Sequence, residues 1–287
     1  MRRRGGIFRI QRTIGVQLLW MKNGRLWHHK RIGHSFWTAN RILAMATVSV
    51  KRRQPLSSQK SPSVAPAPDR FSFRIPVSAL TQAGFRDWAT SDDFPEHIRA
   101  AFIEGEIFIE MSNEELEAHI LVKTEISRAL STLVRELKLG KFFGDGLLIS
   151  NEEASVSNNP DASFFTLESF RSGRVRLVPK KDETERYREV EGTPDWVLEV
   201  VSDSSVQKDT ARLREAYHRA GISEYWLIDA RGDEIHFQIL SHRKNGYAAT
   251  PIRAGWQRSR VFGRAFRLDR QRDALGLWEY TLHVQAD

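Results

Sequence analysis

Two acidic residues in this sequence, Glu199 and Asp161, lie at positions from which their carboxylates could take part in hydrolysis. Glu199 lies inside an apolar run, and alternation places it on the same face as Val197 and Val201. An unpaired buried carboxylate costs several kcal/mol, so Glu199 requires a cation, a donor network or a proton. Asp161 follows Pro160 at the start of another predicted strand. Carboxylates at the ends of adjacent strands would supply the oxygen ligands that Mg²⁺ prefers.

A third residue, Lys208, could supply the positive charge that phosphodiester hydrolysis also needs. It lies in the first turn of the helix predicted after Glu199. A bound metal ion would polarise the phosphodiester and activate water, while the lysine would orient that water or stabilise the transition state. Each residue also has a structural interpretation: a buried salt bridge for Glu199, a turn for Asp161 and a solvated helix surface for Lys208.

The elements that must position these residues indicate an α/β (α+β) fold with a mixed sheet flanked by a few helices. Alternating and apolar runs predict strands over 98–103, 106–111, 141–150, 161–167, 196–201, 224–229 and 234–240. Apolar stripes and capping residues predict helices over 114–137 and 206–220. Residues 168–192 are highly charged and are expected to form a solvated excursion.

The combination of Pro160-Asp161, Glu199 in an apolar strand and a nearby lysine resembles the PD-(D/E)XK phosphodiesterase superfamily. More narrowly, residues 95–240 resemble the bacterial putative restriction endonuclease family. The motifs that carry this resemblance lie at 104–107, 119, 160–161, 194–202 and 217–229. It implies a restriction-endonuclease-like mixed central β-sheet flanked by helices, and cleavage of DNA that depends on Mg²⁺, with Mn²⁺ as the alternative ion.

The resemblance also implies roles for two further residues. Glu106 matches the family's early acidic residue, and would be a third metal ligand or a water-holding group unless it is a solvated hairpin acid. His119 would contact phosphate or relay a proton unless it lies on the helix surface.

The lysine departs from the family pattern. The superfamily's basic pattern has it two residues after the glutamate, where this chain has Val201, and this branch often takes it from the middle of the next helix, where this chain has Arg212. Lys208 is therefore a candidate because of its charge and its place after Glu199, and not because it occupies the family's lysine position.

The positive charge of the chain belongs to its N-terminal part. Residues 1–70 contain 15 Lys and Arg and one Asp, which leaves 29 basic and 35 acidic residues in 71–287. The net charge of +8 is therefore no evidence that the folded part binds DNA. A Ser/Pro/Ala-rich run ends at Pro68, so we expect 1–68 to be a disordered basic extension and linker, and 69–287 to be the nuclease-like domain.

Residues 1–44 have three interpretations: a nucleic-acid-binding arm, an organelle-targeting peptide, or residues upstream of a true start at Met45, which we favour. The lack of cysteine excludes disulfides, thiolate metal sites and cysteine nucleophiles. No apolar run approaches the roughly 20 residues that cross a bilayer. We expect a cytoplasmic protein with DNA as its partner and no membrane partner; a homodimer is left open.

Two other functions compete with a nuclease. A non-catalytic nucleic-acid-binding or interaction module would keep the fold without turnover, with the basic extension carrying the affinity. A histidine-based hydrolase ranks lower, because the nine histidines show no His-x-x-x-His spacing of the kind that binds metal.

Overall fold

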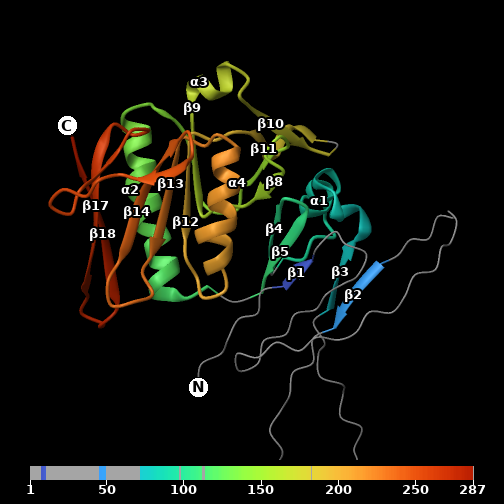
Figure 1. Cartoon of the computed structure of the whole chain (residues 1–287), viewed down its shortest axis with the longest axis horizontal. Helices are drawn as coiled ribbons and strands as arrows, with labels where there is room; N and C mark the ends of the chain where they lie inside the picture. The colour runs from blue at the N-terminus through green and yellow to red at the C-terminus, as the bar shows by residue number, and fades with distance from the viewer. Residues whose placement is uncertain are drawn as a thin grey trace, which may run out of the picture. The chain divides into compact units, whose positions relative to one another are not determined.

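The computed structural model describes residues 8–10, 45–49, 72–96, 98–111, 114–181 and 183–286 (Figure 1). The chain divides into two compact units, one of Met1–Leu19 with Glu96–Asp287 and one of Trp20–Pro95. Apart from two short strands at 8–10 and 45–49, the extension predicted for residues 1–68 lies outside the described residues. The three interpretations of residues 1–44 concern the same part of the chain.

The described part of the smaller unit is an antiparallel pair of strands followed by two short helices. Strand β2 (Met45–Ser49) pairs antiparallel with β3 (Ser72–Pro76), and the 3₁₀ helix η1 (Val77–Leu80) leads into α1 (Gln82–Ala89). Thr81 caps α1, since its hydroxyl accepts a hydrogen bond from the backbone N–H of Gly84. Phe85 and Trp88 fill the space beneath this helix.

The larger unit contains a seven-stranded sheet in the order β1-β5-β4-β8-β7-β11-β10. Its strands are β1 (Phe8–Ile10), β4 (Arg99–Ile103), β5 (Glu106–Glu110), β7 (Leu148–Asn151), β8 (Val156–Asn158), β10 (Val175–Lys180) and β11 (Glu183–Gly192). The predicted hairpin over 98–111 is confirmed as β4 and β5. Its turn residues Glu104 and Gly105 both have positive φ, as a two-residue hairpin turn requires.

A six-stranded sheet, in the order β15-β14-β13-β12-β9-β6, forms the centre of this unit. Its strands are β6 (Gly140–Phe143), β9 (Ala162–Thr166), β12 (Trp196–Val200), β13 (Glu224–Asp229), β14 (His236–Arg243) and β15 (Gly246–Ala249). The predicted apolar strand is confirmed as β12, which is buried along its whole length. It runs parallel to β13 and antiparallel to β9, so its neighbours enclose it on both edges.

The alternating side chains of β12 face two different cores. Trp196, Leu198 and Val200 pack against α2 (Val122–Glu136) and against a C-terminal sheet of β16 (Gln257–Ser259), β17 (Arg264–Arg272) and β18 (Trp278–Gln285). Val197 and Val201 pack against α4 (Leu213–Arg219) and the β4–β5 hairpin. The two helices therefore cover opposite faces of the central sheet (Figure 1).

Both predicted helices begin differently from a regular α-helix. Helix α2 is preceded by the π-helical segment η2 (Leu116–Leu121), and α4 by the π-helical segment η3 (Lys208–Arg212). The carboxylate of Glu115 accepts the backbone N–H groups of Glu117 and Ala118 and so caps η2. π segments inside helices are frequent at functional sites, which draws attention to both helix starts.

Three stretches differ from the sequence expectation. The strand predicted over 141–150 is two strands, β6 and β7, in different sheets. Residues 168–192 are largely exposed, as expected for a charged excursion, but they are regular: they complete α3 (Leu167–Arg171) and form the paired strands β10 and β11, and β11 also pairs with β7. Strands β15 to β18 were not predicted. Among the described residues, no helix has the length and apolar character to span a bilayer.

A buried carboxylate at the start of β13 provides a test of this fold. Glu224 accepts hydrogen bonds from the Trp226 indole at 2.7 Å, the Ser259 hydroxyl at 2.6 Å and the Arg260 backbone N–H at 2.9 Å. Glu224→Ala leaves these donors without their acceptor, so we expect urea denaturation to show a loss of about 2–4 kcal/mol. The exposed-site control Glu234→Ala should change stability by about 0.5 kcal/mol or less. Equal effects of the two substitutions would contradict this account.

Candidate metal and catalytic site

Asp161 and Glu199 lie at the same end of two adjacent central strands. Asp161 directly precedes β9, and its backbone N–H donates to the carbonyl of Leu198 in β12. Ala162 is the register partner of Leu198, so the next residues along the two strands are Asp161 and Glu199. Their relative exposures are only 3% and 2%, so both carboxylates are withdrawn from solvent.

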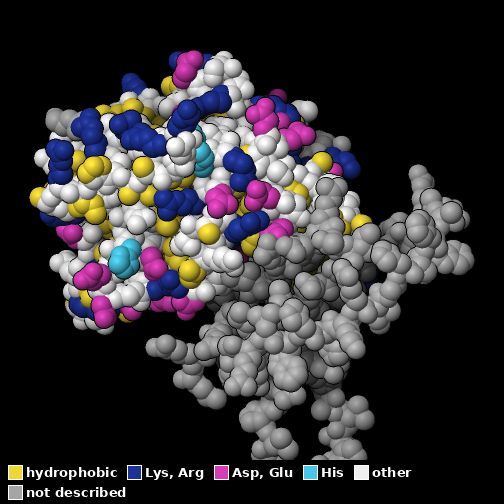
Figure 2. All heavy atoms as spheres, viewed as in Figure 1, with side chains coloured by type: hydrophobic (Ala, Val, Ile, Leu, Met, Phe, Trp, Pro, Cys, Tyr) yellow, Lys and Arg dark blue, Asp and Glu magenta, His cyan; other side chains and the backbone are white. Residues whose placement is uncertain are grey.

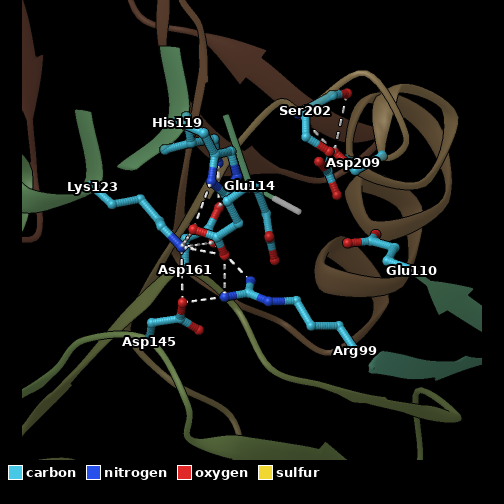
Figure 3. A network of polar contacts seen from close by, with 12 residues as sticks. Arg99, Glu110, Glu114, His119, Lys123, Asp145, Asp161, Ser202 and Asp209 are labelled. Atoms are coloured by element: carbon cyan, nitrogen blue, oxygen red, sulfur yellow. Dashed lines mark hydrogen bonds and ion pairs between the residues drawn. The ribbon is translucent and has the colours of Figure 1, made fainter. Parts of the chain in front are cut away.

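The Asp161 carboxylate is the centre of a polar cluster (Figure 3). One oxygen, Oδ2, accepts the backbone N–H of Val200 at 2.7 Å and lies 3.6 Å from Nε2 of His119. The other oxygen lies 3.3 Å from Nη1 of Arg99 and 3.4 Å from Nζ of Lys123. Asp161 therefore contacts two cations, a histidine and a backbone donor at once.

Two further acids complete this cluster. Glu114 and Asp145 each contact both Lys123 and Arg99, with Lys123 Nζ 2.7 Å from Glu114 and 2.8 Å from Asp145. The side chains come from the start of β4, the segment before η2, helix α2 and the β6–β7 loop, and converge at one point (Figure 3). Glu114, His119 and Asp161 each offer a ligand atom, and these atoms lie within 4.8 Å of one another.

Glu199 occupies a second cluster on the α4 side of the strand. Its Oε1 accepts hydrogen bonds from the Tyr217 hydroxyl at 2.5 Å and the Asn158 amide at 3.0 Å. Burial raises the pKa of Glu199 well above its ordinary value; Lys208 opposes this, while the charges of Asp209 and Asp161 add to it.

Lys208 is held between acids within the second cluster. Its Nζ lies 2.7 Å from Oε1 of Glu110 and 3.3 Å from Oδ1 of Asp209. Burial alone would lower the pKa of Lys208, but the charges of Asp209, Glu110 and Glu199 together raise it. Burial raises the pKa of Asp209 to about 7, although the charge of Lys208 acts in the opposite direction. The lysine is therefore protonated at neutral pH, while Asp209 is partly protonated.

The two clusters together contain more carboxyl groups than cationic side chains. Six carboxylates (Glu110, Glu114, Asp145, Asp161, Glu199 and Asp209) face three cations (Arg99, Lys123 and Lys208). Three buried ligand-type atoms also have ion-pair neighbours but no hydrogen bond of good geometry: Glu110 Oε1, His119 Nδ1 and Asp209 Oδ1. An excess of carboxyl groups beside an imidazole is a ligand set that suits a divalent metal ion, whose binding would favour the ionised forms of the acids.

The structure also places the other residues that the sequence suggested as candidates, namely His119, Glu106 and Arg212. His119 is buried beside Asp161 rather than on the helix surface. Glu106 is also buried, and its carboxylate pairs with Nη2 of Arg212 at 3.1 Å. Arg212, the alternative source of the cation, is thus engaged with the β4–β5 hairpin, where it also lies 3.3 Å from Glu104.

Several residues of the two clusters were not predicted. Lys123 follows His119 by four residues, and this spacing alone could have indicated a shared helix face. Glu110 continues the alternation that includes Glu106, so it too had a local signal. Arg99 and Asp145 had none, because only the packing of separate elements brings them to Asp161.

Comparison with known families gives one match that spans most of the larger unit. Residues 83–271, well over half of the chain, match the profile of the Uma2 family, which is described as putative restriction endonuclease. A crystal structure of a putative nuclease belonging to DUF820 from Anabaena variabilis is similar over 57% of this chain and 82% of its own, with 17% identity and a TM-score of 0.43. No curated protein matches the chain.

The raised pKa of Asp209 predicts how the metal-free protein responds to pH. An unfolded Asp ionises near pH 4, whereas folded Asp209 does so near pH 7, so folding is penalised increasingly as pH rises between these values. Asp209→Asn should remove this penalty, gaining up to about 1.4 kcal/mol relative to the wild type for each pH unit in that window. Denaturation in EDTA from pH 4.5 to 7.5 measures the difference, with the exposed Asp203→Asn as control. Parallel curves for wild type and Asp209→Asn would contradict the assignment.

Proposed function

Because the chain belongs to the putative restriction endonuclease family, we propose that it is a metal-dependent endonuclease that hydrolyses phosphodiester bonds of DNA. The observation that carries this proposal is the cluster of carboxyl groups around Asp161 and Glu199, at the common end of β9 and β12, in which Asp161, Glu199 and Asp209 are buried. Such a cluster is costly in a region of low dielectric unless a cation or protons bind there. If these residues served only to pack the core, the excess of carboxyl groups would lower stability without any benefit.

Asp161 and Glu199 would hold the ion, with Glu114 and His119 available as further ligands and Glu106 as the acid proposed from the family pattern. An oxygen-rich set suits Mg²⁺, while participation of His119 would favour Mn²⁺. When bound, the ion polarises the phosphodiester and lowers the pKa of the attacking water.

The chain's own residues would then orient the reacting groups. Tyr217 and Asn158 both donate to Oε1 of Glu199 and fix the direction of its carboxylate. Two buried lysines supply positive charge in place of the aliphatic Val201: Lys208 beside Glu199 and Lys123 beside Asp161. Either ammonium group can stabilise the charge that develops on the phosphate, because both are shielded from bulk water.

One observation favours a second candidate, a nucleic-acid-binding module without turnover. Arg99 and Lys123 already pair with Asp161, so protein cations neutralise part of the charge that a metal ion would meet. If these pairs persist in the presence of metal, the site is a structural ion-pair network and not a catalytic centre. The two candidates differ in metal binding, which can be measured directly.

Removing either central carboxylate tests the metal site. We expect Asp161→Asn and Glu199→Gln each to abolish Mn²⁺ and Mg²⁺ binding in titration calorimetry and to abolish cleavage of plasmid DNA, since each removes a ligand charge. The exposed Glu136→Gln is the charge-matched control and should bind and cleave like the wild type. Metal affinity retained in both site variants would rule out a shared site and favour the second candidate.

The two lysines can be separated by similar substitutions. Lys208→Met keeps the volume of the buried side chain and removes its charge, so we expect turnover to fall roughly 10²–10³-fold with metal affinity nearly unchanged. Lys123→Met is the paired comparison on the Asp161 side, and Arg212→Ala tests the arginine that pairs with Glu106. If turnover survives in Lys208→Met and collapses in one of the others, the cation role belongs to that residue.

A further inference from the structure

One segment of the larger unit has basic residues but no acidic ones. Residues 235–268 contain no Asp or Glu, whereas residues 71–287 as a whole contain 29 basic and 35 acidic residues. The segment runs from the end of the β13–β14 turn into β17. Its basic residues are Arg243, Lys244, Arg253, Arg258, Arg260, Arg264 and Arg267. Figure 2 shows Lys and Arg side chains gathered across the upper left of the face drawn, with few Asp or Glu side chains among them.

A pocket of about 450 Å³ opens within this segment. Its lining includes Ser223, Ser241, His242, Arg243 and Arg260, and none of its lining residues is an Asp or Glu. Both arginines are exposed, so their guanidinium groups are accessible from solvent. An open, polar pocket between two arginines has the chemistry of an anion site, because guanidinium groups bind phosphate oxygens in pairs.

The walls of this pocket are fixed by contacts beneath it. The rings of His242 and His218 stack with their centroids 4.1 Å apart. Nε2 of His242 lies 3.0 Å from the carbonyl oxygen of His218, and Nε2 of His218 lies 2.6 Å from the carbonyl oxygen of Arg243. The backbone N–H of His242 donates to the carbonyl of Ser223. The Arg260 backbone is held by the buried Glu224. The two arginines therefore extend from backbone positions that are already ordered.

The pocket lies at the opposite end of the central strands from the acidic clusters. Strands β12 and β13 are parallel, with Trp196 beside Glu224 at one end and Val200 beside Ile228 at the other. Ser223 adjoins the first pair, while Asp161 contacts Val200. The strands between them rise about 13 Å. One turn of a DNA duplex, about 34 Å long, is therefore long enough to span the pocket and the acidic clusters.

We propose that this pocket binds a phosphate group of a nucleic-acid backbone, as an anchoring site separate from the acidic clusters. The idea rests on the proposed function in one respect, namely that the polyanion is the substrate of the same domain. Arg243 and Arg260 would hold the phosphate oxygens. A contact of this kind positions the duplex without reading its sequence. It would give a domain that is acidic overall a local surface with affinity for a polyanion.

The test measures DNA binding by the full chain in EDTA, so that no cleavage occurs. We expect Arg243→Ala/Arg260→Ala to weaken binding of a fluorescent duplex two helical turns long. The slope of log affinity against log salt should decrease by about 0.9 for each phosphate that the variant no longer neutralises. The control Lys141→Ala/Arg171→Ala removes the same charge from exposed positions on β6 and α3, and should leave the slope unchanged. Equal slopes for the two double variants would overturn the proposal.

Two further measurements identify the source of the phosphate and exclude unfolding. Arg243→Lys/Arg260→Lys keeps the charge but not the paired geometry, so it should restore part of the affinity, and all variants should melt at the same temperature. Titration with inorganic phosphate examines a free-anion site. If Arg243→Ala/Arg260→Ala abolishes the binding of inorganic phosphate but leaves DNA binding unchanged, the pocket is a free-anion site and the nucleic-acid assignment is overturned. If the wild type cleaves no DNA but the arginine effect persists, the nuclease proposal fails while this one stands.

Discussion

The structure of the larger unit depends on holding six carboxyl groups together beside only three cations, with Asp161, Glu199 and Asp209 among the buried ones. Repulsion of this kind would expel a loop into solvent, so the acids are anchored on strands, helices and short connections that pack into two cores. The π-helical starts of α2 and α4 lie at this point and turn His119 and Lys208 inward. A cation that binds only the folded state would relieve the repulsion and stabilise the fold by mass action.

Charge is segregated along the central strands. The acidic clusters lie at the Val200 end of β12, and the pocket lined by Arg243 and Arg260 lies at the Trp196 end. The total charge of the chain conceals this arrangement, because the N-terminal part carries a large positive excess of its own. Electrostatic fields depend on where charges lie and not only on their sum. A polyanion approaching this domain would meet attraction at the arginine end and repulsion at the acidic end.

How much the sequence could reveal depended on the range of each interaction. Strand β12, the β4–β5 hairpin and the approach of Asp161 to Glu199 follow from alternation and from neighbouring residues. The residues that surround the pair could not be found in the same way. Arg99 and Asp145 lie 62 and 16 residues from Asp161, and only packing of distant elements brings them together. Strands β15 and β16, of 4 and 3 residues, are too short to show an alternation, and arginines interrupt the apolar positions of β17. Strand β18 does alternate, with Trp278, Tyr280 and Leu282 on one face, so its pattern could have predicted it.

The two-sided burial of β12 restricts how this protein can evolve. Even-numbered residues of the strand face the aromatic core around Trp226, and odd-numbered residues face the polar and tyrosine-rich core around Tyr217. Inserting or deleting one residue would exchange the two sets and carry Glu199 into the aromatic side. Substitutions of similar size keep each side chain in its own core. Descendants of this gene can therefore vary the composition of β12, whereas the number of residues between Asp195 and Ser202 is effectively fixed.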